Sequence, residues 1–331
     1  MAPASLVDLF GETPQEAVNA VYRRNSIGAD ERAPTYHQDK DAQYVLPNDF
    51  QEHVRLEIQA LHLSNMMEGH VLHAPIKHSG HQRMLDIGCG TGIITDLMSE
   101  KFPQSDCIGL DLSAVPSIRE HEPNVSFFQG NAAKDAPSQW KSIHGKADLA
   151  KDTELFDYIF SRLLIAGMTD WPAFIRKENE LVKPGGWVEI HDLAWDWYDK
   201  NDTIISNDWS WLYRLSMVCE EEKGMSFQCG KLAKKWMAEA GFVQIRQFEY
   251  RWPFCGNTEE TAEMRAFGEY STTAVPTMIH HMIQRTLDDG SGRGEVKEEV
   301  EAMRADMRWC LLPEEGKYQV FYVTIGRKAE E

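Results

Sequence analysis

The chain has 331 residues, of which 42% are hydrophobic and 26% charged, a balance that is typical of a folded protein and excludes extensive disorder. Acidic side chains outnumber basic ones by 52 to 34, and the formal net charge of -18 disfavours a nucleic-acid partner or an anionic membrane surface. The six cysteines show no CxxC pair and no zinc-type spacing, so we expect reduced thiols and no bound metal.

The first part of the chain, residues 1–47, is polar and interrupted by glycine and proline, which favours a loosely ordered N-terminal arm. It has no signal-peptide pattern, and no later apolar run approaches the ~18 residues of a membrane span, so we expect a cytoplasmic protein. A helix is expected over residues 48–67, because Asn48 or Asp49 can cap its start and apolar side chains return to one face.

From residue 84 onward strand-like and helix-like segments alternate, which predicts an α/β fold with a parallel sheet and helices on both faces. Strands are expected at residues 84–87, 107–111, 125–128, 156–160, 187–191, 243–250 and 318–327. Helices are expected at about residues 92–101, 115–119, 171–182 and 231–240.

The last two strands are separated by about 65 residues of mostly helical pattern, too many for an ordinary connection, which indicates an inserted cap. The chain therefore divides into an arm at 1–47, a ligand-binding core at 48–250 that begins with a covering helix, a helical cap at 251–317, and a final core strand and tail at 318–331.

The clearest motif is RMLDIGCGTGIITDLM at residues 83–98. Gly88, Gly90 and Gly92 follow Asp86 at the end of the first core strand, and a helix begins at the last glycine. Glycine lets the backbone pass close to a ligand, and a helix start offers free N–H donors. This turn is typical of a cofactor site.

The second element of this site is Asp111, which ends the next strand 19 positions beyond Gly92 and can accept both hydroxyls of a ribose. The dinucleotide motif is GxGxxG, but here Ile93 stands where its last glycine would be. The pair therefore predicts a nucleoside ligand without a pyrophosphate.

Five segments resemble, in order and spacing, the class I S-adenosylmethionine-dependent methyltransferases: LDIGCGTG at 85–92, LDLS at 110–113, FFQGNAA at 127–133, FDYIFSR at 156–162 and LVKPGGWVEI at 181–190. The resemblance implies a Rossmann-like sheet of seven strands, mostly parallel with the last one antiparallel. It also implies S-adenosylmethionine as the cofactor and S-adenosylhomocysteine as its product.

Position by position, the resemblance implies that Asp86 and the turn residues Gly88, Cys89 and Gly90 face the methionine part of the cofactor. Six further positions are implied by the family pattern: Asp111 at the ribose, Leu112 on adenine, Asn131 and Ala132 near the adenine amino group, and Ser161 and Arg162 under the cofactor. Asn131 departs from the acidic residue that the family often has there.

A narrower resemblance is to the LaeA-like fungal secondary-metabolism methyltransferases, and it rests on YVLPNDFQEHVRL at 44–56 and MTDWPAF at 168–174. In that group the N-terminal helix covers the cofactor, which implies that Tyr44, Glu52 and Arg55 turn toward it. The alternative is an ordinary helix with an ion pair between positions three apart.

His191 and Asp192 follow the strand at 187–191, at the sheet edge where ligands of open α/β sheets bind. We expect His191 to act as the general base and Asp192 to face the acceptor. A histidine that merely bonds a neighbouring loop is the alternative.

Aromatic residues after this strand favour a pocket for a flat or hydrophobic molecule, with Trp195, Trp209 and Tyr213 as candidates. In the cap, residues 261–287 add Phe267 and His281 as candidate substrate contacts, among several methionines. Packing inside the core, or a homodimer interface through the cap, explains the same residues.

We therefore expect a methyltransferase of a small hydrophobic natural-product intermediate, with oxygen slightly favoured over nitrogen as the acceptor atom. Two alternatives remain: a LaeA-like regulatory protein in a complex, and a methyltransferase-like cyclase that uses the cofactor without methyl transfer. Release of S-adenosylhomocysteine distinguishes the first from both others.

Overall fold

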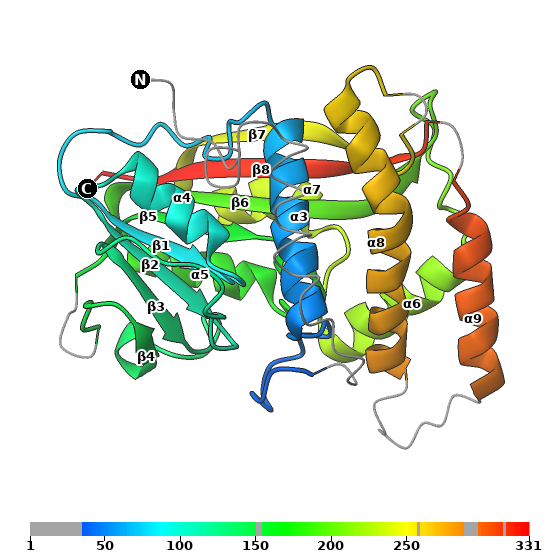
Figure 1. Cartoon of the computed structure of the whole chain (residues 1–331), viewed down its shortest axis with the longest axis horizontal. Helices are drawn as coiled ribbons and strands as arrows, with labels where there is room; N and C mark the ends of the chain where they lie inside the picture. The colour runs from blue at the N-terminus through cyan, green and yellow to red at the C-terminus, as the bar shows by residue number, and fades with distance from the viewer. Residues whose placement is uncertain (1–34, 150–153, 257–258, 288–296, 314–315, 331) are drawn as a thin grey trace.

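The computed structural model describes residues 35–149, 154–256, 259–287, 297–313 and 316–330. Its core is one eight-stranded sheet in the order β4-β3-β2-β1-β5-β6-β8-β7 (Figure 1). The strands are β1 Arg83–Ile87, β2 Asp106–Asp111, β3 Val125–Gln129, β4 Lys141–His144, β5 Phe156–Arg162, β6 Val182–Tyr198, β7 Phe242–Pro253 and β8 Tyr318–Lys328.

The expected mostly parallel sheet is confirmed. β3, β2, β1, β5 and β6 pair in parallel, and β8 lies antiparallel between β6 and β7. The strand count differs by one, because β4 adds a short antiparallel edge beside β3. All four residues of β4 are exposed, so the hydrophobic pattern gave no sign of this strand.

Seven helices are described around the sheet: α3 Phe50–Met66, α4 Ile93–Lys101, α5 Trp171–Leu181, α6 Ser210–Lys223, α7 Cys229–Glu239, α8 Ala262–Leu287 and α9 Lys297–Cys310. The helix expected at 115–119 is absent from the described chain. Pro116 lacks the N–H that a helix needs, and Arg119 instead reaches the Glu57 carboxylate at 2.6 Å. In the described residues no helix has both the length and the apolar character needed to cross a membrane.

The predicted cap corresponds to α8 and α9, which lie between β7 and β8 in the chain. Figure 1 shows α8 standing beside α3, with α9 beyond it. The α3–α8 contact is aromatic, since the His62 ring stacks on Phe267 with centroids 5.0 Å apart and lies 4.9 Å from Tyr270. The helix expected to cover the cofactor is therefore itself joined to the cap.

β6 is 17 residues long and continues past the point where β5 ends. In this extension Leu193 pairs with Phe321 and Trp197 with Gln319 of β8, and β7 pairs Trp252 with Gln319. The three antiparallel-paired strands form a platform beyond the carboxyl ends of the parallel strands, which is where ligands of open α/β sheets bind.

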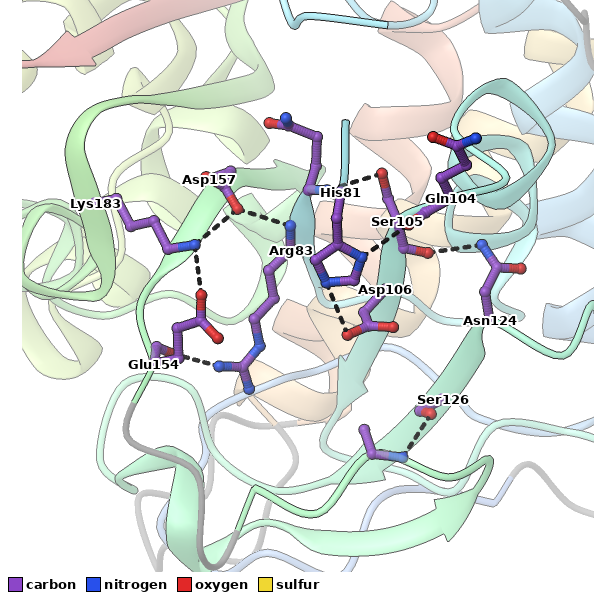
Figure 2. A network of polar contacts seen from close by, with 12 residues as sticks. His81, Arg83, Gln104, Ser105, Asp106, Asn124, Ser126, Glu154, Asp157 and Lys183 are labelled. Carbon is purple, nitrogen blue, oxygen red and sulfur yellow. Dashed lines mark hydrogen bonds and ion pairs between the residues drawn. The ribbon is translucent and has the colours of Figure 1, made fainter. Parts of the chain in front are cut away.

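The opposite edge, at the amino ends of the strands, is held by a polar network (Figure 2). Lys183 contacts Glu154 at 2.8 Å and Asp157 at 3.0 Å, and Asp157 also accepts the backbone N–H of Arg83. His81 lies 3.4 Å from the Asp106 carboxylate at the start of β2. These contacts join β1, β2, β5 and β6 at the edge that carries no ligand turn.

Candidate active site

The glycine turn after β1 packs closely against the end of β2. Gly88, Gly90 and Gly92 have φ angles of +70°, +55° and +80°, a region that side chains rarely adopt, and the Gly88 N–H donates to the Leu110 carbonyl at 2.8 Å. A Cβ on Gly92 would lie 2.6 Å from the Phe127 ring. The turn therefore requires glycine where the sequence motif placed it.

Asp111, at the end of β2, faces this turn. Its Oδ2 accepts the Gly90 N–H at 2.9 Å and its Oδ1 accepts the Ser113 N–H at 2.9 Å. Burial raises the pKa of Asp111, and the two backbone N–H groups oppose that shift. The second lone pair of each oxygen is left for a ligand, which agrees with two ribose hydroxyls.

A single cavity of about 220 Å³ runs from this turn to α8. Of the twelve residues expected to contact the cofactor, eleven line it: Tyr44, Arg55, Asp86, Gly88, Cys89, Gly90, Asp111, Leu112, Asn131, Ala132 and Arg162. The motif spacing thus placed the turn, the end of β2 and the start of α3 around one space.

Ser161 is the exception, and the expectation for it is corrected. It is fully buried and lies outside the cavity lining, whereas its neighbours Phe160 and Arg162 line it. Consecutive side chains of a strand point to opposite faces of the sheet. A residue directly before Arg162 therefore faces away from the cofactor side.

Arg162 and Asp86 form the charged floor of the cavity. Burial lowers the pKa of Arg162 to about 10, so the guanidinium stays charged at neutral pH, yet its buried Nη1 has no hydrogen-bond partner in the described chain. Burial raises the pKa of Asp86 to about 7, against a 2.7 Å bond from the Thr95 hydroxyl. An open cationic donor of this kind fits a ligand carboxylate.

The Asn131 side chain is hydrogen-bonded to the N-terminal arm and to its own loop. Its Nδ2 donates to Asp39 Oδ2 at 2.9 Å, and its Oδ1 accepts the Ala133 N–H at 3.1 Å. Asp39 belongs to the N-terminal arm, so the arm brings a carboxylate to the position where this sequence has Asn131 in place of the acidic residue of the family pattern. Asp39 and Asn131 are 92 positions apart in the sequence, so this contact could not be predicted from local sequence patterns.

Arg55 agrees with both predictions made for it, since it forms an ion pair on α3 and also lines the cavity. Its Nε donates to Glu52 Oε2 at 2.7 Å, three positions earlier on α3, and both residues line the cavity. Tyr44 also lines the cavity, where a Cβ on Gly167 would lie 2.7 Å from its ring. The arm therefore packs on the segment after β5, and α3 covers the turn.

His191 does not reach the cavity, which corrects its role as a general base. It is fully buried, and the Phe160 ring, which lines the cavity, packs on it with centroids 4.8 Å apart. Its Nε2 lies 2.6 Å from Glu189 Oε1, and burial lowers its pKa to about 4. The Phe160 ring therefore separates His191 from the cavity, and the imidazole is uncharged at neutral pH.

Glu189 is the centre of a buried polar cluster that sequence spacing did not reveal. Its carboxylate accepts the backbone N–H groups of His73 and Ala74 and the Tyr158 hydroxyl at 2.9 Å, besides its contact with His191. Ligand atoms of His73, Glu189 and His191 lie within 4.8 Å of one another. The carboxylate oxygens are already used by protein donors, so the cluster serves to anchor residues 73–74 on the sheet.

The six expected substrate contacts also lie outside the cavity lining. Asp192 is buried on the other face of β6, where it accepts the Ile165 N–H at 3.1 Å and holds the segment after β5. Trp195 packs on Phe227 in the core, Phe267 is fully buried against His62, and Tyr213 is 70% exposed. The remaining two, Trp209 and His281, contact Trp211 and His280 instead.

The far wall of the cavity is made by other residues. These are Gln59 on α3, Leu193 on β6, Trp252 on β7, Gln319 on β8, and Ala274, Val275 and Met278 on α8. Only the pairing of β6, β7 and β8 and the packing of α3 and α8 bring them together. The cap thus contributes to the site through residues of α8 that lie between the expected Phe267 and His281.

Comparisons with known proteins agree with this geometry. A family model described as a methyltransferase domain matches residues 50–247, more than half of the chain, and the chain belongs to this family. Methyltransferase pytC of Aspergillus terreus is 28% identical over 222 residues, which cover 66% of this chain and 63% of that protein. The secondary metabolism regulator laeA of Aspergillus fumigatus is 30% identical over 220 residues, or 65% and 54% of the two chains. This chain therefore matches less than two thirds of the length of either relative.

Solved structures with a similar fold include the [4+2]-cyclase SpnF, with a TM-score of 0.45 and 16% identity, covering 95% of this chain and 93% of that one. Phosphoethanolamine N-methyltransferase 2 of Haemonchus contortus, solved with S-adenosyl-L-methionine, has a TM-score of 0.42 and 15% identity, covering 99% and 61%.

The cavity fits S-adenosylmethionine on three observations. Asp111 offers free lone pairs to the ribose hydroxyls, Arg162 offers an open cationic donor to the carboxylate of the methionine part, and the glycine turn leaves backbone exposed between them. When bound, the cofactor supplies an electrophilic methyl group on a positively charged sulfur.

Proposed function

We propose that this chain is an S-adenosylmethionine-dependent methyltransferase that acts on a small hydrophobic natural-product intermediate, with transfer to oxygen favoured over nitrogen. The observation that carries the proposal is the continuity of one cavity. It begins at Asp111 and the glycine turn and ends against the apolar side chains of Trp252, Val275 and Met278. A donor and an acceptor placed in it share one space.

The contribution of the protein is alignment and exclusion of water. Asp111 and Arg162 hold the two ends of the cofactor, while α3 and α8 cover the space in which the acceptor lies. Positioning of two reactants in this way supplies roughly 7–11 kcal/mol of the barrier.

Oxygen is favoured because the acceptor wall carries no charge. His191 lies behind Phe160, and the wall residues from β6, β7, β8 and α8 have no ionisable side chain. A phenol enters as the neutral acid, and its proton passes to solvent as the new carbon–oxygen bond forms. An aliphatic amine enters as an ammonium ion, which loses its water at this wall without gaining a counter-ion.

The second candidate, a regulatory protein in a complex, is favoured by one observation. Tyr213 on α6, Trp309 on α9 and Leu312 just after α9 are 70%, 72% and 48% exposed, and exposed large apolar side chains of this kind are common where protein partners bind. The laeA relative, named as a secondary metabolism regulator, points the same way.

The test is incubation of the protein with S-adenosylmethionine and a panel of phenolic intermediates, followed by mass spectrometry. The enzyme proposal predicts S-adenosylhomocysteine in equal amount to a product that is heavier by one CH₂ group. A rearranged product without S-adenosylhomocysteine would indicate the cyclase alternative. Neither product, with the cofactor still bound, would favour the regulator.

A further inference from the structure

Two glutamine side chains in the cavity wall have no partner. Gln59 of α3 and Gln319 of β8 are only 6% and 4% exposed, both line the cavity, and neither side chain forms a hydrogen bond within the described residues. Buried amides in folded proteins are almost always hydrogen-bonded. Two open amides in the lining of one cavity are therefore candidates to bind the polar groups of a ligand in it.

The wall around Gln319 is apolar and uncharged. Gln319 is paired in the sheet with Trp252, and Leu193, Val275 and Met278 complete this end of the cavity. No ionisable side chain is contributed to it by the described parts of β6, β7, β8 or α8. Gln59 lies where this wall meets the charged part of the lining, one turn after Arg55 on α3. The other charged lining residues come from the arm, the ends of β1, β2 and β5, and the segment that follows β3.

This end of the cavity is also held in place from two sides. Trp252 Nε1 donates to the Ser271 hydroxyl at 3.0 Å, which ties α8 to β7. The Tyr270 hydroxyl donates to the Arg55 carbonyl at 3.1 Å, one helical turn before Gln59 on α3. The amides are thus fixed relative to the glycine turn before any ligand enters, which lowers the entropic cost of binding.

We propose that Gln59 and Gln319 bind the methyl acceptor through its carbonyl or hydroxyl groups, and that the part of the acceptor that lies against β6, β7, β8 and α8 is apolar and uncharged. This proposal rests on the proposed function and assigns its substrate class. A primary amide both donates and accepts, so either a carbonyl or a hydroxyl satisfies it. A charged group at this wall would lose its water without gaining a counter-ion.

The experiment measures the binding of three probes to the protein loaded with S-adenosylhomocysteine, by calorimetry. The probes are naphthalene, 2-naphthol and 2-(aminomethyl)naphthalene, which share one ring system and differ in its polar group. We expect 2-naphthol to bind three- to tenfold more tightly than naphthalene, as one buried hydrogen bond provides. The ammonium probe should bind at least tenfold more weakly than 2-naphthol.

The variants Gln59→Leu and Gln319→Leu remove the amides and keep a side chain of similar size. Each should weaken 2-naphthol by three- to tenfold and leave naphthalene unchanged, and a double variant should bind the two probes equally. Gln104→Leu, at the exposed amino edge of the sheet, is the matched control and should behave as the parent chain. Thermal unfolding and S-adenosylhomocysteine affinity establish that each variant is folded.

Three outcomes would overturn the proposal: no binding of 2-naphthol to the parent chain, no preference for it over naphthalene, or equal losses for both probes in the variants. None of these readouts depends on turnover. Failure of the methyltransferase proposal appears separately, as absence of S-adenosylhomocysteine release with any acceptor.

Discussion

Arg162 combines burial, positive charge and an open donor at the cofactor end of the cavity. If its partner is the carboxylate of the methionine part, Arg162→Gln should weaken S-adenosylhomocysteine by at least tenfold, since a hydrogen bond to a charged group contributes roughly 1.5–3 kcal/mol. The nucleoside 5′-methylthioadenosine lacks that carboxylate and should lose less than threefold. Calorimetry with both ligands checks this, and equal losses would mean that Arg162 acts only through its charge beside Asp86.

His191 illustrates how a polar residue at a strand end can be structural. In the variant His191→Leu, Glu189 keeps its backbone donors but loses the 2.6 Å contact inside the core. We expect the free energy of unfolding to fall by about 1–3 kcal/mol, measured by urea denaturation, with unchanged affinity for S-adenosylhomocysteine. Loss of turnover in a variant as stable as the parent chain would instead restore the general-base role.

At the scale of elements, α8 is joined to α3 and β7 through Phe267. This ring is fully buried between His62 and Trp252, with centroids 5.0 and 5.1 Å away. Phe267→Ala should lower the free energy of unfolding by about 3–5 kcal/mol because it leaves a cavity. Val275→Ala, which removes two methyl groups at the acceptor wall, should cost clearly less in the same urea titration. Comparable costs would contradict the placement of Phe267 in the packed core and of Val275 at the wall of an open cavity.

The elements that could be predicted from sequence are those whose signals are local. The glycine turn, its helix and Asp111 follow from positive φ angles, N–H donors and the parallel pairing of β1 with β2, all within 30 residues of sequence. The end of β6 could not be predicted in the same way. Every residue from Val188 to Trp195 is buried, including the polar Glu189, His191 and Asp192, so a polar side chain in this strand did not identify a residue that meets the cavity.

The same limit explains the acceptor wall. Gln59, Trp252 and Gln319 come from three elements far apart in the sequence, and each has an ordinary core neighbourhood of its own. Only the tertiary structure brings these three residues together in the lining of one cavity. The aromatic cluster that sequence composition favoured, around Trp195 and Trp209, is instead used for packing against Phe227 and Trp211.

For the whole molecule, buried neutral histidines link stability to pH. Burial lowers the pKa of His62 and of His191 to about 4, whereas in the unfolded chain both take up a proton near pH 6.5. Because the unfolded state then binds more protons at these two sites, their contribution to the free energy of unfolding should fall as the pH decreases from about 6.5 to about 4. Asp86 and Asp192, whose pKa values burial raises to about 7, contribute in the opposite direction, so the effect is read from the difference between a histidine variant and the parent chain. In His62→Phe this slope should be smaller by up to about 1.4 kcal/mol per pH unit. Identical slopes in urea titrations across this range would show that His62 is protonated inside the fold.

The central claim is that one cavity holds a nucleoside sulfonium or thioether by its ribose at Asp111, across the glycine turn. The most direct measurement is a calorimetric titration of S-adenosylhomocysteine into the parent chain and into Asp111→Ala. We predict saturable one-to-one binding to the parent chain and at least tenfold weaker binding to the variant, with the variant still folded by its thermal transition. Absence of binding to the parent chain, or equal affinity in the two proteins, would contradict the account.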